Sequence, residues 1–347
     1  MTLSDLAPRR LAPDLTVRPL GISSGTSRWA PSASQPQDAR LLDGLRRALN
    51  AGGDDDGVQL LDTADSHRCG HAERLVGKVL KEHPGHRAQV ASKVGRVQGS
   101  APHPYAGPRV RHQLEQTLEN LYLDQLALYT LESYDFGFGD RYLDPVVEQL
   151  RALRDLGQIR AIGLRSPGSR SSERSIRRFL DLFDRIRPDV LWTQASGLLP
   201  LVDLGGGEDL GAFAVRHGVG LVIASPLAHG VLAGGRVERA LAAWPGTAVD
   251  RGAVASAVAH GLAPLGGRFG SSPQDLARVA LRSILQRVHS AVLVLGLGDE
   301  QQHRHDHGLL GRPLSEQELA FAEAVFARVR SGLFKPEERA PSVEAIV

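Results

Sequence analysis

The 347-residue chain contains a single cysteine, Cys69. One cysteine cannot form a disulfide within the chain, so we expect a reducing compartment and a cytoplasmic protein. Long apolar runs are also missing, and residues 1–18 carry charges and prolines where a signal peptide would be apolar. The net charge of +2 is too small to indicate nucleic acid or an anionic membrane as a partner. The expected partner is therefore a small-molecule substrate, and the oligomeric state is left open.

Lysine is scarce as well, since only four of the 41 Lys and Arg residues are lysine. Arginine keeps its proton in a protein, whereas a desolvated lysine can give it up. A chain that uses arginine for most of its positive charge has kept Lys93 at the end of an apolar run, Val90-Ala91-Ser92. This lysine is therefore a candidate for chemistry.

Strands and helices alternate along the chain after an N-terminal lead. Apolar runs predict the strands, and apolar residues at three- and four-residue spacing predict the helices between them. The strands are expected to end near Ile22, Asp62, Lys93, Leu131, Leu164, Gln194, Ala224 and Gly296, and the helices to cover 37–51, 71–83, 108–121, 144–156, 171–184, 207–217, 273–287 and 315–331. Eight such units predict an α/β protein with a (β/α)8 TIM barrel.

An open, doubly wound sheet is the competing fold. It would usually carry a glycine-rich phosphate loop after its first strand, and residues 21–26 match such a loop poorly. We therefore expect a lead over 1–18, one barrel domain over 19–335 and a tail over 336–347. The barrel has a long loop at about 230–270 with a helix of its own.

Two charged residues follow neighbouring predicted strands. Asp62 ends the run from Val58 to Leu61, and Lys93 ends the next strand. Residues at the carboxyl ends of barrel strands more often serve chemistry than stability. Asp62 and Lys93 are therefore predicted to meet at the mouth of the barrel as part of a catalytic site.

Several short motifs, in this order and spacing, resemble those of the aldo-keto reductase superfamily. The resemblance covers about residues 19–330 and implies a (β/α)8 barrel that binds a nicotinamide dinucleotide across its C-terminal face. A hydride then passes to a carbonyl, and a tyrosine, assisted by lysine, aspartate and histidine, donates the proton. The motifs are Asp62-Thr63-Ala64, Ala91-Ser92-Lys93, Gly157 to Gly163, Gln194, Ser225-Pro226-Leu227-Ala228 and Pro273 to Ala277.

Two positions of the catalytic set depart from the family pattern. Asp62 and Lys93 match its aspartate and lysine, but its tyrosine corresponds to His67 and its histidine to Glu132. Family members that reduce a conjugated C=C bond also carry glutamate at the second position. A neutral imidazole is a weak proton donor, so His67 would act only as an imidazolium, held by Asp62 and Glu132, or as a base.

The predicted cofactor site matches the family pattern at some positions and departs from it at others. The resemblance assigns Gln194 to the carboxamide, the Ser225-Pro226-Leu227 loop to the diphosphate and Gly296 to the exit of the last strand. Arg165 and Ser166 replace the expected Ser-Asn pair, and Ala224 replaces the aromatic residue that stacks on the nicotinamide. The clamp for a 2′-phosphate is missing, so NADPH, NADH or no dinucleotide are all open.

A few further residues are candidates for contact with the substrate or with a metal ion. Tyr105, in the loop after the third predicted strand, and Trp29 are candidates for substrate contact, and Arg165 could hold a substrate anion. His303, His305 and His307 would need a third convergent ligand to form a transition-metal site, so no metal is expected.

Three functions remain open. The first is a nicotinamide-dependent oxidoreductase that reduces a C=O or conjugated C=C bond of a small molecule in specialised metabolism. The second is a redox-neutral lyase, dehydratase or isomerase, in which Lys93 is the base or Schiff-base amine and His67 and Glu132 move protons. The third is a non-catalytic binding barrel. The oxidoreductase is favoured because the aspartate, lysine and glutamine of the family are present.

The protein should bind NADH no more weakly than NADPH. Asp299 and Glu300 stand where a 2′-phosphate clamp is expected, and their negative charge disfavours that phosphate. Calorimetric titration with both dinucleotides measures the ratio, and a clear preference for NADPH would contradict the expectation.

Overall fold

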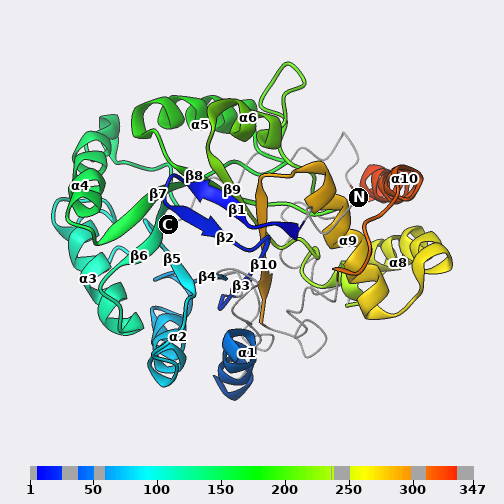
Figure 1. The fold of residues 1–347 in the computed structure, drawn as a ribbon. Coiled ribbons are helices and arrows are strands. Elements are labelled where there is room, and N and C mark those ends of the chain that lie inside the picture. Colours follow the sequence, from blue (N-terminus) through cyan, green and yellow to red (C-terminus); the bar gives the residue numbers. More distant parts are fainter. Residues whose placement is uncertain are drawn as a thin grey trace.

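The computed structural model describes residues 6–25, 38–50, 59–235, 237, 251–297 and 310–333. Eight parallel strands close into a barrel in the order β10-β3-β4-β5-β6-β7-β8-β9 (Figure 1). This confirms the predicted (β/α)8 fold. The strands are β3 (Leu20–Ser23), β4 (Leu60–Asp62), β5 (Gln89–Val94), β6 (Leu126–Leu131), β7 (Ile159–Arg165), β8 (Val190–Gln194), β9 (Gly220–Ala224) and β10 (Ala291–Gly296).

Helices surround the barrel on its outside (Figure 1). They bury apolar faces against the strands, and Leu41, Leu45, Val76 and Val79 are examples that are almost fully buried. The α-helices are α1 (Asp38–Asn50), α2 (His71–Glu82), α3 (Arg109–Leu121), α4 (Leu143–Asp155), α5 (Glu173–Ile186), α6 (Leu210–His217), α8 (Arg251–Phe269), α9 (Pro273–Arg287) and α10 (Glu316–Leu333), and the short 3-10 helices are η4 (Phe138–Asp140) and η5 (Val231–Ala233).

A hairpin closes the N-terminal end of the barrel. Strands β1 (Arg9–Ala12) and β2 (Leu15–Val17) pair in antiparallel fashion and cross the barrel in Figure 1. Leu11, Leu15 and Val17 of the hairpin join the apolar residues inside the barrel in one buried cluster. Water is therefore kept from that end, and the opposite end, where the strands finish, is left for chemistry.

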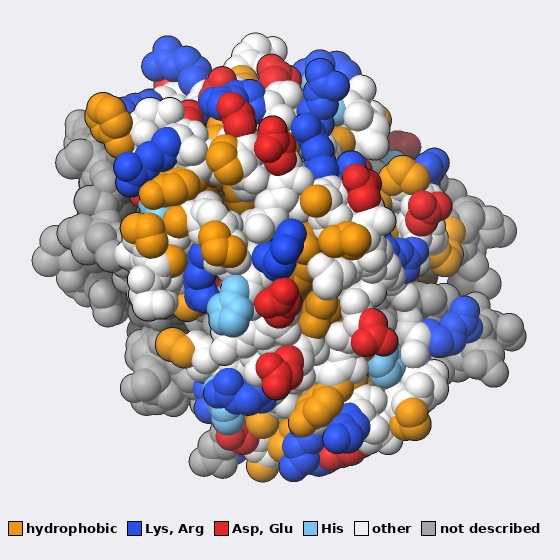
Figure 2. All heavy atoms as spheres, turned by 90° about the vertical axis from the view of Figure 1, so that its left-hand side faces the viewer, with side chains coloured by type: hydrophobic (Ala, Val, Ile, Leu, Met, Phe, Trp, Pro, Cys, Tyr) orange, Lys and Arg blue, Asp and Glu red, His pale blue; other side chains and the backbone are white. Residues whose placement is uncertain are grey.

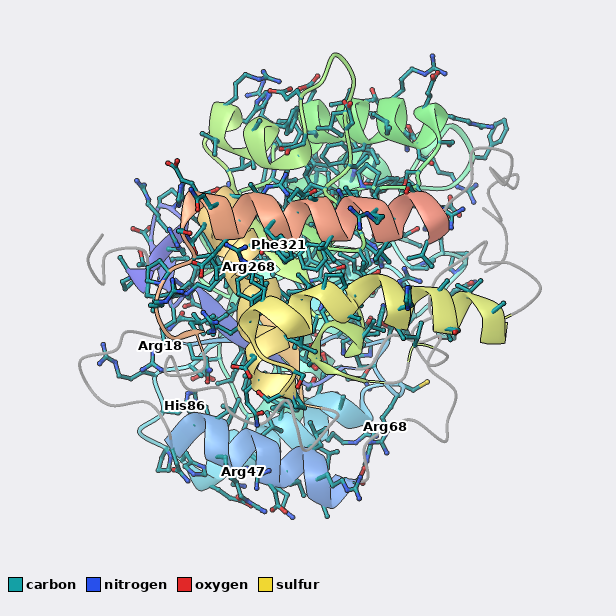
Figure 3. All side chains as sticks on the ribbon, turned by 90° about the vertical axis from the view of Figure 1, so that its right-hand side faces the viewer. Arg18, Arg47, Arg68, His86, Arg268 and Phe321 are labelled. Atoms are coloured by element: carbon teal, nitrogen blue, oxygen red, sulfur yellow. The ribbon has the colours of Figure 1, made fainter. Side chains whose placement is uncertain are left out.

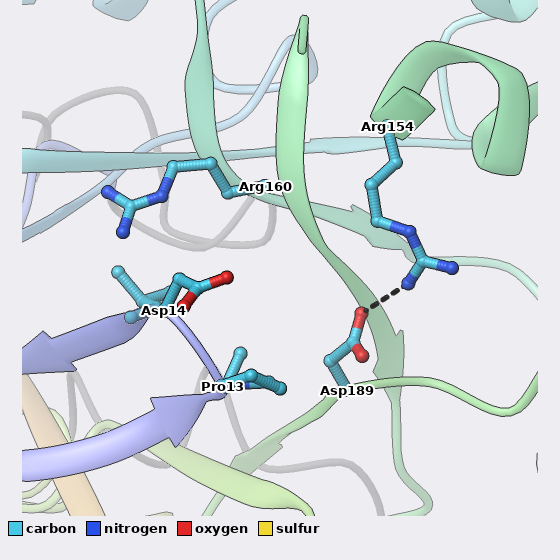
Figure 4. A pocket seen from close by; sticks show the side chains of 7 residues that line it. Pro13, Asp14, Arg154, Arg160 and Asp189 are labelled. Atoms are coloured by element: carbon cyan, nitrogen blue, oxygen red, sulfur yellow. Dashed lines mark hydrogen bonds and ion pairs between the residues drawn. The ribbon is translucent and has the colours of Figure 1, made fainter. Parts of the chain in front are cut away.

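A cavity of about 150 Å³ lies where the hairpin meets the strand starts (Figure 4). Arg154 and Asp189 form an ion pair of 3.2 Å on its wall. Arg160 donates to Gln89 at 2.6 Å, and Asp14 is exposed at the hairpin turn. The cavity thus lies at the end of the barrel opposite to Asp62 and Lys93.

The C-terminal helices pack together on one side of the barrel. Figure 3 shows Arg268 of α8 near Phe321 of α10, and its guanidinium lies 4.9 Å from the ring centroid. Helix α9 begins at Ser272, whose hydroxyl accepts a hydrogen bond from the amide of Asp275. This cap satisfies one amide of the first helical turn and fixes where the helix starts.

The predicted strands and α-helices agree with the observed ones to within about three residues, and the β1–β2 hairpin and the short η4 are additions. The segment expected as a plain lead, 1–18, contains the β1–β2 hairpin. Within the loop expected at 230–270, η5 and α8 are described, whereas 236 and 238–250 lie outside the described residues. The tail 336–347 lies outside them too.

The surface on the α3 and α4 side of the barrel mixes charges of both signs. Figure 2 shows basic, acidic and hydrophobic side chains interspersed on this face. None of the helices in the described ranges combines the length and the apolar character that a membrane span needs.

Candidate active site

Asp62 and Lys93 meet at the mouth of the barrel, as the sequence predicts. Strands β4 and β5 pair in parallel with Asp62 opposite Ala91, so Lys93, two residues further, points to the same inner side. The Lys93 ammonium donates to Asp62 Oδ1 at 2.7 Å and to the carbonyl of Thr63 at 2.6 Å. Ser23 donates to the other oxygen of Asp62 at 3.2 Å.

This pair is almost fully buried, with side-chain exposures of 1% for Lys93 and 3% for Asp62. Burial raises the pKa of Asp62, and the charge of Lys93 and its hydrogen bond act against that rise. A buried ion pair is costly unless its remaining hydrogen bonds are satisfied. Ser23 and the Thr63 carbonyl supply these bonds, which is why the pair persists inside the fold.

Glu132 follows β6 and faces the same space. Its side chain, 6% exposed, lies 3.2 Å from Arg96 and 3.4 Å from Arg165. The hydroxyl of Ser66 donates to it at 3.4 Å. The structure therefore places Glu132 beside two guanidinium groups, with Arg96 and Ser66 as neighbours that sequence reasoning missed.

Trp192 forms the floor under the charged groups, and sequence reasoning also missed it. Its ring lies 5.1 Å from the Lys93 ammonium and 5.3 Å from the Arg165 guanidinium. Both distances are within the range of cation–π contacts. Its position two residues before Gln194 on one strand was an available signal, because alternate residues of a barrel strand face the same side.

His67 lies in the loop after β4, with its ring directly over Gly25. A Cβ built on Gly25 would lie 1.9 Å from the imidazole, so only glycine leaves room for this ring. Burial, with help from the charges of Lys93 and Arg96, lowers the pKa of His67 to about 3. Burial and these two cations act against the charged form of the ring, so the imidazolium held by Asp62 and Glu132 gains no support here and stays a prediction.

The neutral ring of His67 keeps a free nitrogen. Its Nδ1 is buried and has no hydrogen-bond partner among the described residues. A neutral imidazole with an unpaired nitrogen is able to accept a proton, so the second reading of His67, as a base, remains a prediction.

Tyr105 has a structural role in place of the predicted substrate contact. Its side chain is 1% exposed, and its hydroxyl contacts the carbonyls of Val94 and Ser133 and accepts from the Ser133 amide. Burial raises the pKa of this phenol. Gly95 has φ +117°, and a Cβ there would collide with the Tyr105 hydroxyl. The Tyr105 hydroxyl thus links the loops after β5 and β6 by hydrogen bonds. It is not available to replace the family tyrosine, whose position is occupied by His67.

Behind the site lies a second group of buried polar residues that the sequence reasoning did not single out. Glu73 of α2 accepts hydrogen bonds from Ser92 at 2.8 Å, from Thr117 at 3.1 Å and from Asn120 at 3.1 Å. Asp65 is buried, and neither carboxylate oxygen has a partner among the described residues. Desolvation, followed by the charges of Glu73 and Glu132, raises the pKa of Asp65 well above its ordinary value.

The predicted cofactor residues end neighbouring strands on the same rim. Gln194 ends β8 opposite Ala224 of β9, and Gly296 ends β10 opposite Ser23 of β3. The Gln194 amide makes no hydrogen bond to any described residue, so it is free for a carboxamide. Ser225 starts the next loop with φ 56°, a bend that turns Pro226 and Leu227 back into the protein. These residues fit a nicotinamide dinucleotide.

Arg165 and Ser166, at the end of β7, differ in how well they suit dinucleotide binding. Ser166 is buried, and its hydroxyl donates to the Pro167 carbonyl at 3.2 Å. Arg165 extends toward Glu132 and stacks on Trp192. Burial lowers the pKa of Arg165, against the effect of Glu132. Arg165 is thus better placed to hold an anion than to replace the serine of the family pair.

Some predicted residues cannot be placed. Trp29, Asp299, Glu300 and the three histidines at 303, 305 and 307 lie outside the described residues. Within the described ranges, no three His, Cys, Asp or Glu side chains are grouped so that they could hold a metal ion.

Comparison with known proteins agrees with this geometry. The sequence profile of the aldo/keto reductase family matches residues 21–326. The chain belongs to this family.

Individual relatives are distant. The chain is 25% identical to L-galactose dehydrogenase of Arabidopsis thaliana over 249 residues, which cover 71% of this chain and 72% of that protein. The aldo-keto reductase AKR11C1 of Bacillus halodurans, in its holo form, superposes with a TM-score of 0.67 at 20% identity, covering 96% of this chain and 99% of that one. An aldo/keto reductase from Klebsiella pneumoniae in complex with NADP and acetate gives 0.63 at 18% identity, covering 92% and 95%. The structural matches support the fold.

Stability should fall in mild acid because of His67. Its pKa is about 3 in the folded protein against 6.5 for an unperturbed histidine, so between these values the unfolded chain binds the extra proton. Between about pH 7 and pH 5, the wild type should lose roughly 1–2 kcal/mol more unfolding free energy than His67→Gln. Urea titrations at both pH values measure this difference, and equal losses in the two proteins would show that the ring is charged in the fold.

Proposed function

We propose that this protein is a nicotinamide-dependent oxidoreductase that reduces a C=O or conjugated C=C bond of a small molecule in specialised metabolism. The observation that carries the proposal is the buried contact of 2.7 Å between Lys93 and Asp62 at the strand ends. The family membership and the free amide of Gln194 support the cofactor. Location in the cytoplasm stays a prediction.

Gln194 and the Ser225 loop would hold the dinucleotide, with NADH accepted as well as NADPH. When bound, such a dinucleotide would supply a hydride for an electron-poor carbon of the substrate. The remaining requirement is a group that stabilises the negative charge that develops on the substrate oxygen.

Lys93 is the group that meets this requirement. Two of its three ammonium protons are directed at Asp62 and the Thr63 carbonyl, which leaves one for a substrate oxygen. His67 is neutral and lacks the acidity of a phenol, so it does not replace the family tyrosine as proton donor. Asp62 holds the ammonium in position by its hydrogen bond of 2.7 Å. Conjugated substrates suit this arrangement, because an enolate oxygen needs charge stabilisation more than immediate protonation.

A redox-neutral reaction is the second candidate, and the unpaired Nδ1 of His67 favours it. In this reaction His67 would remove a proton from a carbon whose carbonyl Lys93 polarises. Burial lowers the pKa of the ring and makes it a weak base, so this reaction is the less favoured of the two. Turnover without any nicotinamide distinguishes this reaction from reduction.

Replacing Lys93 with methionine should lower kcat by at least 10³-fold in assays of NADH or NADPH consumption with short aldehydes and enones, because the charge that stabilises the substrate oxygen is lost. Lys78→Met, on the exposed face of α2, is the matched control and should keep full activity. The double variant Asp62→Asn/Lys93→Met removes both charges and guards against misfolding from an unpaired aspartate. Unchanged turnover in a folded Lys93→Met protein would contradict the proposal.

Replacing His67 with tyrosine should raise the rate of aldehyde reduction by at least tenfold. The substitution restores a phenol beside Lys93, and the charge of the ammonium makes that phenol a better acid. His67→Phe, which adds a ring without a hydroxyl, is the control. A gain shared by both variants would assign the effect to the shape of the site and not to proton donation.

A further inference from the structure

The described part of the barrel mouth carries an excess of positive charge. Lys93 is matched by Asp62, but the two guanidinium groups of Arg96 and Arg165 face the single carboxylate of Glu132. Among the side chains in these contacts, three cations face two carboxylates, which favours an anion as ligand.

Arg96 and Arg165 also have N–H donors that their contacts with Glu132 do not use. Each guanidinium has five N–H donors, and the contacts with Glu132, at 3.2 and 3.4 Å, are longer than the 2.7–2.9 Å typical of a tight charge-assisted pair. Each of the two side chains is 28% exposed, so both remain reachable from the mouth. A ligand is therefore able to bind them without first breaking a tight ion pair.

The shape of the site selects among anions. The guanidinium of Arg165 lies 5.3 Å from the centroid of the Trp192 ring, which holds it in a fixed position. A fixed, planar guanidinium matches a planar carboxylate in bidentate geometry. Both arginines belong to the β5–β7 side of the mouth, whereas the Ser225 loop follows β9. The anion is therefore part of the substrate and not the diphosphate of the cofactor.

We infer that the substrate is a carboxylic acid whose carboxylate binds Arg165 and Arg96, with its reducible bond over Lys93. The inference rests on the proposed function for the reaction, but the binding step is measurable without turnover. Glu132 then positions both arginines and, by its charge, limits how tightly the carboxylate binds.

Butyrate and its neutral isostere butyramide are suitable probes, titrated calorimetrically into the full-length protein with and without NADH. Butyrate should bind at least tenfold more tightly than butyramide. Arg165→Met should weaken butyrate binding by 10- to 100-fold, since a charge-assisted bidentate contact is lost. Arg165→Lys keeps the charge without the planar fork and should lie in between. Arg160→Met, at the opposite end of the same strand, is the matched control and should bind butyrate as the wild type does.

Glu132→Gln gives a result that a purely structural role would not produce. Removing its charge frees both guanidinium groups, so butyrate should bind severalfold more tightly. Equal binding of butyrate and butyramide, or no effect of either Arg165→Met or Glu132→Gln, would overturn the inference.

The reaction itself is tested with succinic semialdehyde and butanal, which differ in a carboxylate. The wild type should show a lower KM for the acid, and Arg165→Met should raise that KM while leaving the KM for butanal unchanged. Failure to consume either aldehyde would contradict reduction of short aldehydes by the proposed mechanism, whereas the calorimetric result with butyrate would still decide whether a carboxylate binds.

Discussion

The site depends on one buried ion pair, Lys93 with Asp62. Two charges at this depth are stable only where each finds further hydrogen-bond partners, and Ser23 and the Thr63 carbonyl provide them. These partners come from three consecutive strands or their ends, β3, β4 and β5, so the pair forms only when these strands are paired side by side. Closure of the barrel places Trp192 and Glu132 around the ammonium.

Loss of the family tyrosine changes the acidity of the side chain at this position more than the charge of the site. The loop after β4 still delivers a side chain to the site, but this side chain is a neutral imidazole over Gly25. In the proposed function, proton donation is therefore weaker, while Lys93 still stabilises charge on the substrate oxygen. In the same region, Arg165 stands where the family has a small polar residue. Under the proposal, both changes favour a substrate that is activated by conjugation and carries its own negative charge.

Much of this architecture was predictable because barrel strands and helices have distinct apolar periodicities. The ends of β4, β6, β8 and β9 at Asp62, Leu131, Gln194 and Ala224 agree with the predicted ends. The β1–β2 hairpin was missed because its strands are only three or four residues long, and so short an alternation is lost among the prolines and charges of the lead. Tyr105 was misjudged for another reason: a loop position near the mouth does not reveal whether a hydroxyl points to substrate or to backbone.

The amino-acid sequence by itself determined the fold class, the pairing of Asp62 with Lys93 and the presence of a histidine where the family has tyrosine, because these follow from periodicity, strand register and motif order. Only the tertiary structure decided that burial lowers the pKa of His67, that Tyr105 is committed to Val94 and Ser133, and that Arg96 joins Arg165 at Glu132. Those properties depend on desolvation and on contacts between loops from different strands. Neither can be predicted from the sequence of a single strand and its loop.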